Sequence, residues 1–174
     1  MLIFAKSDDE KRPMTTGEKS LLSKSFSSNP AVLEDFYTWL EGALSPLLLG
    51  KENLNRVVLS TAEAFSNALL HGNRANPKKK VWVQIVRSGR DLAMRVGDEG
   101  VGSRPHAPKK SRPLDTSGRG WEMMHKLADR VSIRRQNGFF WVELSFKMPK
   151  DYKEQPKKKG GKKGAGKICS GGGR

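Results

Sequence analysis

Apolar residues recur every three or four positions in two long stretches of this sequence, which is the spacing of a helix with one buried face. The first stretch follows Asn29-Pro30, a pair suited to a helix cap and a first helical position, and continues to about Leu44. The second runs from about Lys51 to His71. Its apolar stripe consists of Leu54, Val58, Ala62, Phe65 and Leu69. The pattern predicts two amphipathic helices, separated by a turn at Pro46 and Gly50.

Shorter apolar runs bounded by turn residues predict strands. The expected strands cover residues 21–27, 81–86, 92–96, 131–135 and 139–146. Two pairs of them form hairpins, turned at 88–91 and at Gln136-Asn137-Gly138. A short helix is expected at 120–127. Helices grouped with hairpins predict an α+β fold, a two-layer sandwich of a mostly antiparallel sheet with helices on one face.

The ends of the chain differ from its centre. Hydrophobic residues make up only 36% of the sequence, mainly because both ends are polar. We therefore expect one domain at residues 21–149, between a flexible arm at 1–20 and a disordered basic tail at 150–174 that is rich in Lys and Gly. Residues 97–117 have no regular pattern, and a connection of this length favours a functional loop such as a mobile lid.

Charge and cysteine content restrict the function only loosely. The formal net charge of +15 could attract ATP, an acidic protein or nucleic acid. From Asp151 onward, eight Lys and Arg residues face two acidic ones, which suits a solubilising tail or weak, nonspecific nucleic-acid contact. Cys169 is the only cysteine, so neither an internal disulfide nor a structural zinc site is supported. No apolar stretch is long enough for a membrane span, and we expect a cytoplasmic protein.

The second predicted helix carries the first candidate site. Glu63 and Asn67 are four residues apart, so they share a polar face opposite the apolar stripe, and His71 continues that edge one turn later. A carboxylate beside an amide oxygen suits a hydroxyl or water next to a hard cation such as Mg²⁺. For His71, capping or packing at the helix end is favoured over catalysis.

Two glycine-containing segments supply further candidates. Asp98, Gly100 and Gly102 follow a strand, where the glycines let the backbone approach a ligand and the carboxylate can accept from an exocyclic amine. Ser117-Gly118-Arg119-Gly120 opens a helix, where free N–H groups favour phosphate. Neither segment is a Walker A loop or a dinucleotide fingerprint.

In order, the segments Glu63-Ala64-Phe65-Ser66-Asn67-Ala68-Leu69-Leu70-His71-Gly72, Asp98-x-Gly100-x-Gly102 and Gly118-Arg119-Gly120-Trp121 resemble the N, G1 and G2 boxes of the GHKL ATPases. The resemblance covers about residues 21–149. Within that superfamily, the short chain and the Glu-x-x-x-Asn-Ala-x-x-His-Gly pattern look like anti-sigma-factor serine/threonine kinases of bacterial partner-switching systems. This resemblance implies the histidine-kinase-like ATPase fold and a role in transcription regulation.

The resemblance also implies roles for individual residues. Glu63 would be the general base, and Asn67 the Mg²⁺ ligand. Asp98 would hold the adenine amino group of ATP. The remaining contacts would be Gly100 and Gly102 at the base and ribose, and Ser117, Gly118, Arg119 and Gly120 at the phosphates. A lid cation for the γ-phosphate would be Arg119, Arg112 or a nearby lysine, and Trp121 is expected to pack within its helix.

The implied partners are an anti-anti-sigma protein of the STAS type, which would be the phosphorylated substrate, and a sigma factor, with the kinase itself a homodimer. Three alternatives remain open. The chain could bind ATP without turning it over, or act as a nucleic-acid-associated protein through its basic tail. The catalytic half of a histidine kinase is less favoured, because no upstream helix carries a phosphoacceptor histidine.

Overall fold

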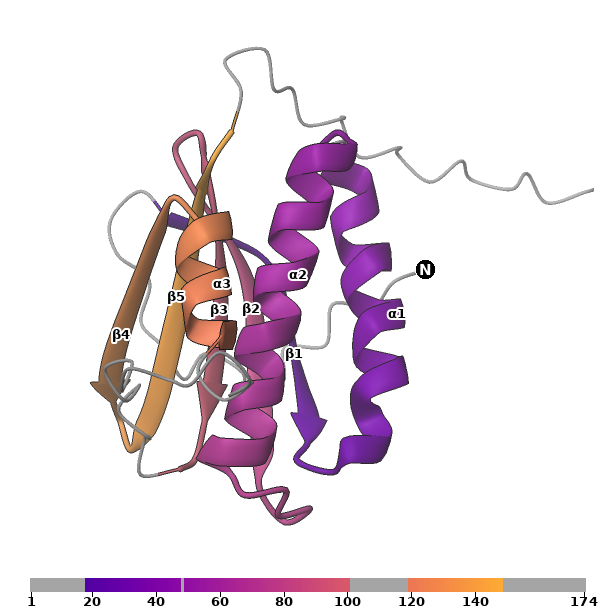
Figure 1. The fold of residues 1–174 in the computed structure, drawn as a ribbon, viewed down its shortest axis with the longest axis vertical. Helices are drawn as coiled ribbons and strands as arrows, with labels where there is room; N and C mark the ends of the chain where they lie inside the picture. The colour runs from indigo at the N-terminus through magenta and orange to yellow at the C-terminus, as the bar shows by residue number, and fades with distance from the viewer. Residues whose placement is uncertain (1–17, 48, 101–118, 149–174) are drawn as a thin grey trace, which may run out of the picture.

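A computed structural model describes residues 18–47, 49–100 and 119–148. Five strands form one sheet in the order β1-β2-β3-β5-β4, and all four neighbouring pairs are antiparallel (Figure 1). The strands are β1 (Glu18–Ser27), β2 (Lys80–Ser88), β3 (Asp91–Asp98), β4 (Arg130–Gln136) and β5 (Phe139–Lys147). Each predicted strand is present, which confirms the two hairpins, and β1 is an edge strand.

The strands extend up to three residues beyond their predicted limits. β1 begins at Glu18 rather than at residue 21. β3 continues through Gly97 and Asp98, where the sequence predicted the start of a loop. Both residues stay in the sheet because β3 has a partner strand on each side: Asp98 pairs with Val81 of β2 and with Phe140 of β5. Asp98 is therefore held by two ladders rather than by a free loop.

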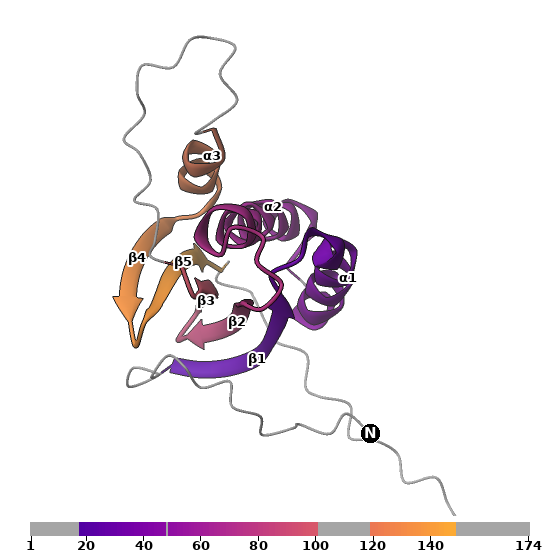
Figure 2. The same ribbon diagram turned by 90° about the horizontal axis from the view of Figure 1, so that it is seen from below.

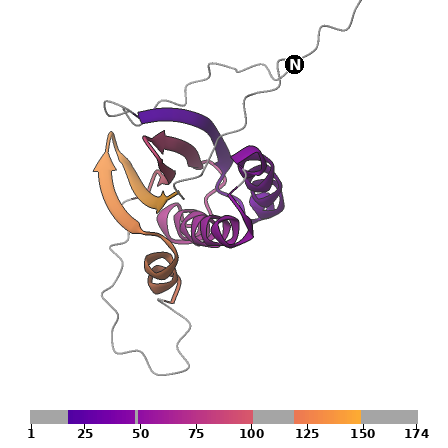
Figure 3. The ribbon, with the colours of Figure 1, turned by 90° about the horizontal axis from the view of Figure 1, so that it is seen from above.

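The three α-helices lie on one face of the sheet, α1 over β1 and α2 over the centre (Figures 2 and 3). They are α1 (Leu33–Leu44), α2 (Lys51–Asn67) and α3 (Arg119–Leu127). Before α1, Pro30–Val32 form a 3₁₀ turn, and the Asn29 side chain accepts from Ala31 N at 3.1 Å, as the predicted cap requires. This arrangement confirms the α+β sandwich.

The end of the second predicted helix is a π-helix, Ala68–Gly72, instead of an α-helix. Asn73 N donates to Ala68 O over five residues, at 2.8 Å. Leu69 O accepts from Ala75 N at 2.8 Å and from the hydroxyl of buried Ser28 at 3.3 Å. The wider turn is stable because donors from outside the helix satisfy carbonyl groups at its end.

Aromatic rings join the two layers. Phe36 of α1 stacks on Phe65 of α2, with ring centroids 3.9 Å apart, and Phe26 of β1 meets both rings edge-on. In the predicted stripe of α2, Ala62, Phe65 and Leu69 are buried, whereas Leu54 and Val58 are half-buried. The stripe therefore faces the core, as its period predicted.

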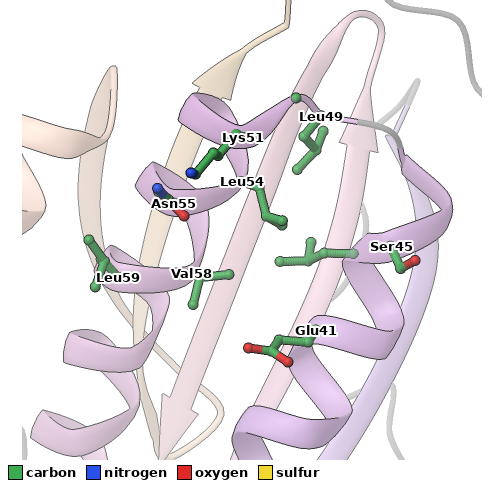
Figure 4. A pocket seen from close by; sticks show the side chains of 10 residues that line it. Glu41, Ser45, Leu49, Lys51, Leu54, Asn55, Val58 and Leu59 are labelled. Atoms are coloured by element: carbon green, nitrogen blue, oxygen red, sulfur yellow. The ribbon is translucent and has the colours of Figure 1, made fainter.

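Leu54 and Val58 line an apolar groove between the end of α1 and the start of α2 (Figure 4). Glu41 and Lys51 also line it, and half-exposed Leu59 lies at its side. All its α2 residues belong to the first half of that helix. The groove is thus at the opposite end of α2 from Asn67.

The other face of the sheet carries a buried ion-pair cluster. The Arg95 side chain has no exposed surface, and it binds Glu143 at 2.6 Å and Glu18 at 2.5 Å. A buried guanidinium is tolerated only when carboxylates pair with it in this way. The cluster ties β1, β3 and β5 together.

Candidate functional site

Asp98 is a buried carboxylate at the end of β3, with only 3% of its surface exposed. Gly100 N donates to its Oδ1 at 2.8 Å, and among the described residues no donor reaches Oδ2. Burial raises the pKa of this carboxyl to about 6, against the lowering effects of the Gly100 N–H and of Lys79. Near neutral pH the group is ionised and has an acceptor oxygen to offer.

Two glycines allow close packing around this carboxylate. A methyl group on Gly72 would overlap the Asp98 carboxylate, and one on Gly100 would overlap Gly72 O. The end of the π-helix and the turn after β3 therefore touch through backbone atoms. This contact explains physically why Gly100, a predicted site residue, is a glycine. Gly72 was not among the predicted ligand-contacting glycines.

Asn73 fixes the same turn, and the sequence analysis assigned it no role. Its side chain accepts from Glu99 N at 2.9 Å and donates to Lys80 O at 2.8 Å. Glu99 in turn accepts from Lys80 N at 2.8 Å. The available sequence signal was an amide residue directly after a helix end, where such side chains commonly bond to the backbone.

Glu63 and Asn67 form a pair on α2, as their spacing predicted. Asn67 Nδ2 donates to Glu63 Oε1 at 3.0 Å, and both residues are half-buried. Gly120, at the start of α3, lies so close that a methyl group there would overlap the Glu63 carboxylate. The structure thus brings together Glu63, Asn67 and Gly120 from segments more than fifty residues apart.

The other predicted site residues lie in different surroundings. Arg119 is exposed at the start of α3, and Trp121 is half-buried and packs against the core, with its ring 4.9 Å from that of His125. His71 is exposed and makes no hydrogen bond, ion pair or ring contact to a described residue. Gly102, Arg112, Ser117 and Gly118 lie outside the described residues, as does the basic tail.

The site residues thus form two groups, one around Glu63 and Asn67 and one around Asp98. The first lies on the second half of α2, and the second lies against its π-helical end. Nine residues separate Glu63 from Gly72, which is roughly 13 Å along a helix axis. At one end, a buried ionised carboxylate with an available oxygen suits an amino group on a flat base. At the other end, a carboxylate and an amide suit a hydroxyl and a hard cation. This chemistry fits an adenine nucleotide with Mg²⁺.

The model of the histidine kinase-like ATPase domain family matches residues 26–146, well over half of the chain. The chain belongs to this family. The match confirms the superfamily that the three sequence boxes indicated, and with it an ATP-binding fold.

Individual relatives sharpen this assignment. The chain is 26% identical to the anti-sigma F factor of Oceanobacillus iheyensis over 122 residues, which cover 67% of this chain and 82% of the relative. It is 28% identical to the anti-sigma F factor of Bacillus cytotoxicus over 94 residues, which cover 51% of this chain and 64% of that protein. The alignment thus spans less than two thirds of the second relative. These similarities support the resemblance to anti-sigma-factor kinases.

A solved structure shares the fold. The structure of the RsbU and RsbW domains of Rv1364c from Mycobacterium tuberculosis superposes with a TM-score of 0.54 at 15% identity, covering 73% of this chain and 31% of that one.

Within the described ranges, no helix has the length and apolar character needed to cross a membrane.

Proposed function

We propose that this chain binds Mg²⁺-ATP and is a cytoplasmic protein serine/threonine kinase that acts as an anti-sigma factor. Its substrate is a serine or threonine hydroxyl on an anti-anti-sigma protein of the STAS type, and as a homodimer it sequesters a sigma factor. The observation that carries the proposal is the Glu63–Asn67 pair beside the start of α3, in a histidine kinase-like ATPase domain that is similar to anti-sigma F factors.

The residues would hold the nucleotide from two ends. Asp98 accepts from the adenine amino group, and the close packing at Gly72 and Gly100 holds its carboxylate in place. Asn67 already uses its amide nitrogen on Glu63, so its amide oxygen is the atom available to the cation. Arg119 and Gly120, with Gly102, Ser117 and Gly118, are proposed ribose and phosphate contacts. When bound, Mg²⁺-ATP supplies the phosphoryl group.

Glu63 is the proposed general base. Its carboxylate takes the proton from the substrate hydroxyl, and the hydrogen bond from Asn67 orients the carboxylate for this step. Phosphoryl transfer depends mainly on positioning and electrostatics, so one carboxylate, one cation and a phosphate contact surface are sufficient.

The test is to replace Glu63 with alanine and to follow binding and transfer separately. Glu63→Ala is expected to leave ATP affinity nearly intact and to abolish phosphorylation of the partner that co-purifies with the chain, as measured by phosphosite mapping. Glu52→Ala, at an exposed glutamate in the first turn of the same helix, is the matched control. Equal loss of binding and transfer in Glu63→Ala would overturn the base role.

A second variant tests the cation site. Asn67→Ala should weaken the Mg²⁺-dependent part of ATP binding, because it removes the proposed amide ligand. Nucleotide affinity that is unchanged both with and without Mg²⁺ would overturn this role.

A module that binds ATP without turnover is the second candidate function. It is favoured by the contact between Gly120 and Glu63, which places the start of α3 against the proposed base. ATP binding by the wild-type chain without phosphorylation of any captured partner would select this candidate over the kinase.

A further inference from the structure

We propose that Asn73 is a positioning residue that sets the base selectivity of the site, because it fixes the Asp98–Gly100 turn against the end of the π-helix. This inference rests on the proposed function, in which Asp98 accepts from the amino group of adenine. It assigns a role to a residue that would not itself contact the nucleotide.

Asn73 is buried, with only 1% of its surface exposed, and it bonds to three segments of the chain. Its backbone N–H closes the π-helix on Ala68 O. Its side-chain Nδ2 donates to Lys80 O at the start of β2, and its Oδ1 accepts from Glu99 N in the turn after β3. These segments meet where α2 ends and β2 begins, at the lower end of Figure 1.

The strand ladders hold the backbone of Asp98, and the junction at Asn73 helps to set the position of its carboxylate. Gly100 N donates to Oδ1, and Gly100 is also in contact with Gly72. A shift of the turn after β3 relative to the end of the π-helix therefore changes the position of the carboxylate. Glu99 lies between Asp98 and Gly100, and its N–H is anchored by Asn73. Removing the Asn73 side chain leaves two part-buried backbone groups, Glu99 N and Lys80 O, without their protein partner, and the turn shifts to recover one.

A small shift changes selectivity more than overall affinity. Adenine offers an amino donor at the position where hypoxanthine has a carbonyl acceptor. A fixed carboxylate accepts from the first and opposes the second, and a site with rigid polar groups discriminates most strongly. When the carboxylate can move away, it disfavours hypoxanthine less and favours adenine less, so the ratio of the two affinities falls.

The experiment compares ATP with inosine triphosphate (ITP) by equilibrium titration in the wild-type chain, Asn73→Ala and Asn73→Asp. Asn76→Ala is the matched control, because Asn76 lies with Asn73 in the loop between the π-helix and β2. It is exposed, and among the described residues its side chain accepts only from Lys78 N. The wild type and Asn76→Ala should prefer ATP by roughly 10- to 100-fold, the range for a hydrogen bond to a charged group. In Asn73→Ala the preference should fall to within about threefold.

Asn73→Asp keeps an acceptor for Glu99 N but loses the donor to Lys80 O, so its preference should lie between those of the wild type and Asn73→Ala. It also decides the question if Asn73→Ala does not fold. A wild-type ATP-to-ITP ratio in the Asn73 variants overturns the inference, as does equal weakening of both nucleotides, which is the result expected of a merely structural residue.

Asp98→Asn separates failure of this inference from failure of the proposed function. If Asp98→Asn removes the preference for ATP and the Asn73 variants keep it, the function stands and the role of Asn73 falls. If the wild type shows no preference for ATP over ITP, the role of Asp98 and the role of Asn73 fall together.

Discussion

The two ends of the candidate site surround their carboxylates in different ways. Asp98 is buried, it ends a strand that is paired on both sides, and the backbone of Gly72 and Gly100 packs against it. Glu63 is half-buried, and its contacts are the amide of Asn67 and the start of α3. The proposed base-binding end is therefore built mainly from backbone atoms, whereas the proposed reaction end is built from side chains that can rotate.

This difference suits the roles that we propose for the two ends. Recognition of a flat base requires an acceptor at a fixed position, which backbone packing provides. At the other end, Glu63 and Gly120 lie in contact, so a cation and phosphates between them require these groups to separate. We expect the base-binding end to change little when nucleotide binds and the start of α3 to move. The same substitution, glycine to alanine, probes both ends.

The largest effect is expected from Gly100→Ala. The added methyl overlaps Gly72 O, a backbone atom that no rotamer change can move. We expect a loss of about 3 kcal/mol in the free energy of unfolding, at the upper end for overpacking, and about a 100-fold loss of ATP affinity. Urea denaturation and calorimetric titration measure the two effects.

Gly42→Ala is the control for this substitution. Gly42 is an exposed helix residue in α1, and nothing lies within 4 Å of the added methyl. It should be neutral or stabilising by up to about 1 kcal/mol, because alanine favours helix. If Gly100→Ala behaves like Gly42→Ala, the base-binding end is not fixed by its backbone.

Asp98→Asn is expected to stabilise the ligand-free chain by about 3 kcal/mol at pH 7, since burial raises the pKa of this carboxyl from its ordinary 3.8 to about 6 in the folded chain. Burial favours the protonated form of Asp98. The stability that the wild type gains from the protonated carboxyl is therefore fully present below pH 3.8 and is lost as the pH rises through about 6. The difference between variant and wild type should therefore vanish near pH 4. Denaturation curves from pH 4 to 8 measure it, and a constant difference would show that the carboxylate is not buried in a charged state.

The smallest effect is expected from Gly120→Ala. Its methyl overlaps only the end of the Glu63 side chain, which can rotate away, and alanine is favoured in the first turn of α3. The free energy of unfolding should change by less than about 1 kcal/mol, and ATP affinity by less than about threefold. A destabilisation as large as that of Gly100→Ala would show that both ends are equally rigid.

Local sequence patterns were sufficient for much of this structure. The three- and four-residue period placed Phe65 and Leu69 in the core and Glu63 beside Asn67, because both features depend only on helix geometry. The strand and turn pattern around Asp98 located the carboxylate, although the strand extends further than its composition indicated.

Features that depend on distant residues were not predicted. The π-helix accepts a hydrogen bond from the hydroxyl of Ser28, and Asn73 bonds to Lys80 and Glu99, so neither feature is visible in a local pattern. The buried Arg95 is similar: its strand was predicted, but its two carboxylate partners are 48 and 77 residues away. Such contacts form only when the sheet brings separate segments together.

The most direct test of the account is a calorimetric titration of the wild-type chain and Asp98→Asn with Mg²⁺-ATP at pH 7.5. Asparagine replaces one of the two carboxylate oxygens with an amide NH₂ group, which is a donor, so Gly100 N and the adenine amino group no longer each have an acceptor oxygen of their own. The account predicts that the wild type binds ATP and that Asp98→Asn binds it at least about 10-fold more weakly. Equal affinity of the two proteins for ATP, or no binding by the wild type, would contradict it.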